Sequence, residues 1–162
     1  MAIPKDENMF PHNALDSFNV AVATPGAFDG ATTGARGDDG GAKDPLTLFT
    51  VTGDVLVRIF GVCTTLLAST GAGTLSVGVA GNTAALIALT TATEIDADEL
   101  WSDASPSVGV DTLASVLGPY IIVNGLDINE YVGTADIQSG QIRYICLWRP
   151  LSEDGNVVGI AS

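Results

Sequence analysis

Carboxylates at close spacing are the first residues in this chain whose types could carry chemistry. They form one acidic section and are hard oxygen ligands of the kind that Ca²⁺ prefers: Glu94, Asp96, Asp98, Glu99 and Asp103. An EF-hand loop that started at Asp96 would place Leu100 at a ligand position and Trp101 where glycine is required. The EF-hand motif is therefore excluded, while a calcium site of another kind and a solvated acidic loop both stay open.

Two glycine-rich segments, Gly71–Gly73 and Gly78–Gly81, resemble phosphate-binding loops only superficially. A dinucleotide fingerprint needs a strand, three correctly spaced glycines and the start of a helix. Counted from Gly71, the position of the third glycine is Ser76, which lies inside an expected strand. No Walker pattern with its lysine is present either. We interpret both segments as hairpin turns and expect no bound cofactor.

Nucleophilic catalysis has little support in the sequence. His12 is the only histidine and lies in a polar, proline-flanked stretch, whereas a catalytic histidine must be held rigidly. A glycosidase with two carboxylates stays open in principle, but aromatic residues for a sugar-binding cleft are scarce. Trp101 is the only tryptophan in the acidic section, and Tyr144 and Trp148 are expected in the core. We therefore predict no catalytic residue, no metal ligand and no enzymatic activity.

The charge of the chain is strongly negative, with 19 acidic and 6 basic residues and a formal net charge of -13. Between Arg58 and Arg143 there is no lysine or arginine, while nine acidic residues fall in this interval. Nucleic acids are bound by neutralising phosphates with basic side chains, so neither nucleic acid nor an anionic membrane is an expected partner. No secretory signal and no window of roughly 18 apolar residues is visible, which predicts synthesis in a cytoplasm.

The residues between 46 and 63 alternate in the way that is typical of β-strands. Gly53-Asp54 marks a bend, and Asn124-Gly125 predicts a type I′ turn between the segments 119–123 and 126–132. In the segment 141–148 one face carries Ile142, Tyr144, Cys146 and Trp148. About eight to ten strands separated by turns predict an all-β fold, an antiparallel β-sandwich or jelly-roll-like domain over residues 46–162.

Residues 1–45 are interpreted as an extended N-terminal arm with a Gly/Asp-rich loop, which contains at most a short strand over residues 19–24. The arm is either a mobile surface loop or a segment that orders on a neighbouring subunit. Its phenylalanines Phe10, Phe18 and Phe28 are the expected partner contacts.

Two cysteines and three arginines lie within the expected strands. Cys63 and Cys146 are either buried free thiols or a disulfide. The rare strand cations Arg58, Arg143 and Arg149 pair with carboxylates across strands or across a subunit boundary, and Arg149 joins the expected partner contacts.

The region from residue 46 to 160, with its ending Leu147-Trp148-Arg149-Pro150-Leu151-Ser152-Glu153-Asp154-Gly155, resembles small virion proteins of tailed bacteriophages. Among these it is most similar to capsid decoration (cement) proteins. The resemblance implies a β-rich homo-oligomer, a trimer or a dimer, that binds the major capsid protein on the outer surface of a virion and stabilises the shell. A phage tail or fibre protein and a carbohydrate-binding β module are the alternatives.

Overall fold

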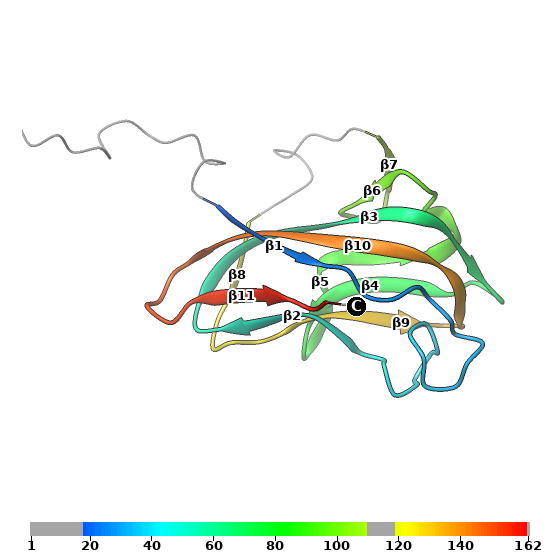
Figure 1. Cartoon of the computed structure of the whole chain (residues 1–162), viewed down its shortest axis with the longest axis horizontal. Helices are drawn as coiled ribbons and strands as arrows, with labels where there is room; N and C mark the ends of the chain where they lie inside the picture. The colour runs from blue at the N-terminus through cyan, green and yellow to red at the C-terminus, as the bar shows by residue number, and fades with distance from the viewer. Residues whose placement is uncertain (1–17, 110–118, 162) are drawn as a thin grey trace, which may run out of the picture.

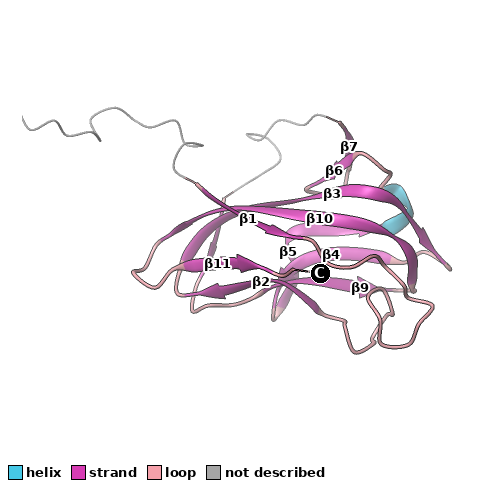
Figure 2. Ribbon diagram, in the orientation of Figure 1, coloured by secondary structure: helices cyan, strands magenta, loops and turns pink. Residues whose placement is uncertain are grey.

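The computed structural model describes residues 18–109 and 119–161, and these residues form two antiparallel β-sheets packed face to face (Figure 1). The described residues contain eleven strands, and one short 3-10 helix, η1 (Ala92–Glu94), lies at one end of the layers (Figure 2). This architecture is a β-sandwich. The predicted all-β, antiparallel fold class is confirmed.

Sheet A has six strands in the order β1-β10-β3-β6-β7, with β8 also paired to β3. Its central pair, β3 and β10, is the longest, at 15 and 14 residues, and buried and less buried residues alternate from Val55 to Cys63 and from Gln141 to Leu147. The strands are β1 (Asn19–Ala23), β3 (Val55–Ser69), β6 (Glu99–Trp101), β7 (Ser107–Val108), β8 (Tyr120–Ile122) and β10 (Ile137–Pro150).

Sheet B has five strands in the order β11-β2-β9-β4-β5. The strands are β2 (Leu46–Thr52), β4 (Thr74–Val79), β5 (Asn82–Thr91), β9 (Ile128–Gly133) and β11 (Asn156–Gly159). The turn between β4 and β5 uses Gly81, whose φ of 85° a glycine adopts without strain. The hairpin expected at Gly78–Gly81 is therefore present. Gly71–Gly73 is not a hairpin turn as expected, because it joins β3 of sheet A to β4 of sheet B and these strands do not pair.

The core lies between the sheets and is built from the alternating apolar residues of the longest strands. The side chains expected on one face of residues 46–63 are all at most 3% exposed: Phe49, Val51, Val55, Val57 and Ile59. Trp101 and Tyr144 are fully buried, and their ring centroids lie 6.2 Å apart. The expectation that Tyr144 belongs to the core is confirmed.

Three chain segments cross between the sheets at one end of the sandwich, at the left of Figure 1. Gly53, with φ of 60°, and Asp54 lead from β2 in sheet B to β3 in sheet A. The Asp54 Oδ1 atom accepts a hydrogen bond from the Asn124 amide at 2.9 Å, and the Asp54 carbonyl accepts one from the Leu151 amide at 2.8 Å. Asp54 lies in one crossing and is thereby hydrogen-bonded to the other two.

The Asn124-Gly125 turn differs from the expectation. Both residues have positive φ, 56° and 66°, as a type I′ turn requires. The flanking strands nevertheless do not pair with each other, because β8 pairs with β3 in sheet A and β9 pairs with β2 and β4 in sheet B. The turn is a corner between the two sheets and not the tip of a hairpin.

The sequence predicts that the sandwich begins at residue 46. In the structure it also includes β1 and the loop 24–45. Strand β1 pairs with β10 along its whole length, and the loop 24–45 is bonded to the rest of the sandwich through Ile137. Phe28 and Arg36 are buried at 3% and 4% exposure, so this glycine-rich loop has side-chain anchors. Residues 1–17 of the expected arm lie outside the described residues.

Candidate functional site

The outer face of sheet A is the candidate site, because its side chains point away from the core in continuous rows. Alternation along β3 and β10 sends every second residue outward, opposite the buried positions. The strand registers align these residues across the sheet. The rows are Arg149–Leu56–Ile121, Val20–Leu147–Arg58, Val22–Ile145–Phe60 and Arg143–Val62–Leu100.

Nine of the twelve residues in these rows are apolar. Val20 is 63% exposed, Val22 46% and Ile121 66%, and the other apolar side chains of the face are half-buried. Single exposed apolar residues are normal on proteins, but a contiguous patch that spans a sheet is typical of an interaction surface.

The three remaining residues of the face are arginines, Arg58, Arg143 and Arg149. Strands β1, β3, β8 and β10 contain no aspartate or glutamate, so these strands place no carboxylate on the face. The chain as a whole carries a net charge of -13. These four strands therefore contribute arginines and no acidic residue to the face of a strongly acidic molecule.

Arg58 has an unused hydrogen-bond donor at this face. Its Nε atom is buried and has no partner within the part of the chain that the structure describes. Its guanidinium carbon lies 5.5 Å from the centroid of the Phe18 ring, and that of Arg149 lies at the same distance. A buried donor without an acceptor costs about 1–3 kcal/mol, so the Arg58 Nε atom lowers the stability of this part of the sheet.

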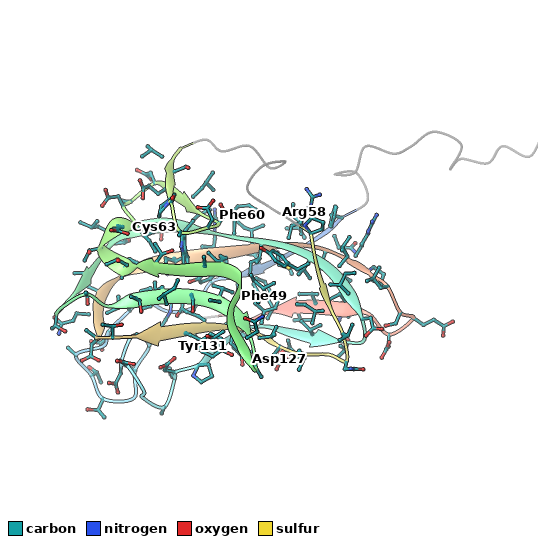
Figure 3. All side chains as sticks on the ribbon, turned by 180° about the vertical axis from the view of Figure 1, so that it is seen from behind. Phe49, Arg58, Phe60, Cys63, Asp127 and Tyr131 are labelled. Carbon is teal, nitrogen blue, oxygen red and sulfur yellow. The ribbon has the colours of Figure 1, made fainter. Side chains whose placement is uncertain are left out.

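The outer face of sheet B has a different composition. The outward residues of β2, β4, β9 and β11 are mostly uncharged and polar: Thr50, Thr52, Ser76, Asn129, Tyr131 and Val158. Figure 3 shows the contrast, with Arg58 and Phe60 on one side of the molecule, Phe49 between the sheets, and Asp127 and Tyr131 on the opposite side. Only sheet A combines apolar side chains with arginines on its outer face within the described residues.

The partner contacts expected from the sequence have different locations. Phe10 lies outside the described residues. Phe18 and Arg149 come together at the outer face of sheet A. Phe28 is buried under the Arg36 guanidinium, whose carbon lies 3.8 Å from the ring centroid, so it packs inside the protein and offers no contact surface.

A buried ion pair that the sequence analysis missed holds the loop 24–45. Arg36 donates from Nε to Glu130 Oε1 at 2.8 Å and from Nη2 to Oε2 at 2.6 Å. Its Nη1 atom donates to the Gly26 carbonyl at 2.6 Å, and the Tyr144 hydroxyl donates to Glu130 Oε2. Burial lowers the pKa of Arg36, but the charge and hydrogen bonds of Glu130 outweigh this effect and raise it above its ordinary value.

One member of the ion pair, Glu130, could have been recognised from the sequence. Glu130 takes an inward position of β9, between the buried residues Ile128 and Val132, where alternation predicts an apolar residue. A cavity of about 420 Å³ next to Arg36 is lined mainly by the same loop. The nitrogen atoms of Arg36 are already bonded to Glu130 and Gly26, so the pair is best explained as the anchor of this loop.

The acidic section does not gather its carboxylates around one point. Among the described residues, no group of three or more His, Cys, Asp or Glu side chains could hold a metal ion. Glu99 is buried, and its Oε2 atom accepts the Asp96 amide at 2.8 Å. Trp101 is buried and donates to Thr90 Oγ1 at 2.8 Å, so it does not line a cleft. His12 lies outside the described residues.

Both cysteines are free and buried. Burial raises the pKa of Cys63 to about 11 and that of Cys146 to about 12. Thiolates are the reactive form of cysteine, so these side chains act as small apolar core residues.

A polar cleft of about 400 Å³ lies at the crossings between the sheets and is lined by Gly53, Asp54, Asn124, Ser152 and Asp154. Its groups bond to one another, since Ser152 Oγ donates to Asp154 Oδ1 at 2.6 Å and accepts the Asp54 amide at 2.8 Å. This cleft is explained by the structure of the crossings.

The fold and the site together define an antiparallel β-sandwich with an apolar, arginine-bearing outer face. No helix within residues 18–109 and 119–161 is long and apolar enough to cross a membrane. Comparison of the chain with family models, curated proteins and solved structures finds no match.

Proposed function

We propose that this protein is a structural subunit that decorates the outer surface of a bacteriophage capsid and stabilises it through contacts between subunits. The observation that carries the proposal is the outer face of sheet A, which joins nine apolar residues and three arginines in one contiguous surface. Such a surface suits a protein partner, because apolar area supplies affinity and arginine supplies directed hydrogen bonds. The resemblance of residues 46–160 to decoration proteins is the reason for proposing a bacteriophage capsid as the assembly.

The proposal includes no enzymatic role. Its partner is the major capsid protein, its site of action is the outside of the virion, and the protein is made in the host cytoplasm. The strongly negative charge suits a surface protein of a particle, because net charge limits nonspecific association with nucleic acid and with other particles.

Quantitative mass spectrometry of purified particles from the source of this sequence tests the proposal. We expect a copy number comparable to that of the major capsid protein. A handful of copies per particle would favour the tail or fibre alternative. Complete absence from particles would overturn the virion role.

The carbohydrate-binding alternative gains no support from the aromatic residues of the described chain. Trp101 and Tyr144 are fully buried, and Trp148 is half-buried on the inward side of β10. A platform for a sugar ring needs exposed aromatic faces.

A further inference from the structure

We propose that Asn124 is a site of covalent modification, at which the side chain deamidates spontaneously at a rate that the fold controls. Asn124 is the only asparagine of the chain that is followed by glycine. Because glycine has no side chain, nothing hinders the approach of the Gly125 nitrogen to the Asn124 side chain. The inference goes beyond the proposed function and does not depend on the partner that the outer face of sheet A binds.

The reaction needs only the two residues of this corner and water. The Gly125 backbone nitrogen loses its proton and forms a bond to Cγ of Asn124, while the side-chain amide nitrogen takes up a proton and leaves as ammonia. The product is a five-membered succinimide ring. Water then opens the ring at one of its two carbonyl carbons, which gives aspartate or, when the backbone carbonyl is attacked, isoaspartate. No oxidant, reductant or cofactor takes part.

Water reaches the side chain that reacts. Asn124 is exposed and lines the polar cleft of about 400 Å³ at the crossings between the sheets. Its backbone amide donates to Asp54 Oδ1, whereas no hydrogen bond holds its side-chain amide within residues 18–109 and 119–161. The side chain is therefore free to rotate toward the Gly125 nitrogen.

The fold slows the reaction through the other partner, the Gly125 nitrogen. Its N–H donates to the Gly53 carbonyl at 2.9 Å, and the turn holds φ of Asn124 at 56° and φ of Gly125 at 66°. The nitrogen must leave this carbonyl and lose its proton before it can attack, so the ring closes only when the corner opens. The rate in the folded protein is therefore the rate in the unfolded chain multiplied by the fraction of molecules in which the corner is open.

Three Asp-Gly dipeptides could close the same ring, and their glycine nitrogens are also bonded. The amides of Gly30, Gly40 and Gly155 each donate a hydrogen bond at 3.0 Å. Aspartate releases water when the ring forms, and the ring takes up water when it opens, so these sites change no mass. Asn124 instead exchanges ammonia for water. A gain in mass therefore distinguishes Asn124 from the Asp-Gly sites.

The product should make the corner less stable. Either product places a new carboxylate in the cleft, which is already lined by Asp54 and Asp154 and by no basic residue. Carboxylates that share one site repel each other. Isoaspartate also adds a carbon atom to the backbone of the corner that joins β8 to β9. Modified protein, separated by ion exchange through its added negative charge, should melt about 2–4 °C below the unmodified protein.

Incubation of the full chain at neutral pH, folded in buffer and unfolded in guanidinium chloride, tests the inference by peptide mass mapping over time. In the unfolded chain, Asn124 should be converted faster than any other asparagine. In the folded protein its conversion should be slower by about tenfold or more. Equal rates in the two states would overturn the control by the fold, and the absence of faster conversion at Asn124 in the unfolded chain would overturn the site itself.

Two variants test whether opening of the crossing sets the rate. Asp54→Ala removes the acceptor of the Asn124 amide and should speed deamidation of the folded protein by about fivefold, with no change in the unfolded chain. Glu153→Ala removes an exposed carboxylate from the neighbouring crossing and is the matched control, which should react as the unmodified protein does. Equal rates for the two folded variants would overturn the role of the crossing, and an unchanged melting temperature of the modified protein would overturn the loss of stability.

Discussion

At the scale of single residues, the Arg36–Glu130 pair is the interaction on which the loop 24–45 depends. Both side chains are almost fully buried, at 4% and 1% exposure. A buried charge without its partner is far more costly than the pair itself is favourable. The pair therefore matters most when only one of its members is removed.

Glu130→Leu should lower the free energy of unfolding by about 3–5 kcal/mol, because it leaves the Arg36 charge buried and unpaired. The double variant Arg36→Met/Glu130→Leu should recover a large part of this loss, since it removes both charges. Urea denaturation of the two single variants and the double variant gives the coupling free energy directly. A double variant as unstable as the sum of the single losses would contradict this account of the pair.

The buried thiols should make the protein less stable in alkali. The Cys146 thiol has an ordinary pKa of 9.0, and burial raises it to about 12 in the folded protein. The unfolded chain therefore releases this proton first as the pH rises. The stabilising contribution is fully present below pH 9 and is lost between pH 9 and 12, at about 1.4 kcal/mol per pH unit.

Cys146→Ala removes one group whose pKa differs between the folded and the unfolded chain, so the free energy of unfolding should fall less steeply as the pH rises. Denaturation midpoints measured at several pH values between 8 and 11 would reveal the difference. The comparison uses the slope with pH, so a constant loss from the smaller side chain does not affect it. Burial raises the pKa of Cys63 to about 11 and that of Tyr144 well above its ordinary value. Some alkaline destabilisation should therefore remain in the variant, and an unchanged slope would contradict the assignment to Cys146.

At the scale of elements, the chain passes from one sheet to the other at Gly53-Asp54, Asn124-Gly125 and residues 151–155. Asp54→Ala should cost about 1 kcal/mol, because it removes the acceptor of the Asn124 amide. Glu153→Ala, which removes an exposed carboxylate from the same region, is the control and should change stability by less than about 0.5 kcal/mol. Thermal unfolding of both variants is sufficient, and equal losses would argue against a special role of the Asp54 side chain.

Local patterns predicted the strands well and their partners poorly. Alternation between residues 46 and 63 identified the buried side of β2 and β3, because one apolar face follows directly from a period of two. The Asn124-Gly125 dipeptide correctly indicated positive φ, but the strand pairs depend on which sheet covers each apolar face. Turn chemistry acts over four residues and carries no information on that choice.

The candidate site was also only partly predictable, because local patterns do not predict which strands pair. The outward residues of β3 could be read from the sequence, whereas their alignment with Val20 and Ile121 requires the registers of β1 and β8. Phe28 was expected to be a partner contact, because a free segment gives a large apolar side chain nothing to pack against. Its burial follows from the Arg36–Glu130 pair, whose members are 94 positions apart, a separation that no local pattern reports.

At the scale of the whole molecule, residues 18–45 are part of the folded unit. Deleting residues 1–45 should therefore abolish cooperative unfolding, because it removes β1 from the edge of β10 and leaves Glu130 buried without Arg36. A chain that starts at Phe18 keeps both features and serves as the control. Circular dichroism and thermal melts would distinguish them, and a stable, cooperative product of the longer deletion would show that the loop and β1 are dispensable.

The hydrogen bonds between the first and the last strands of the described chain also affect the order in which this protein can fold. β1 pairs with β10, the Thr24 amide donates to the Ile160 carbonyl, and the Ile160 amide donates to the Leu48 carbonyl. During synthesis on a ribosome, β1 is made before β10, and the strands β2 to β9 are made between them. Non-local pairings of this kind fold slowly, and their unpaired strands are prone to aggregate. β1 should therefore stay unpaired until β10 has left the ribosome, and the nascent chain should benefit from a chaperone until then.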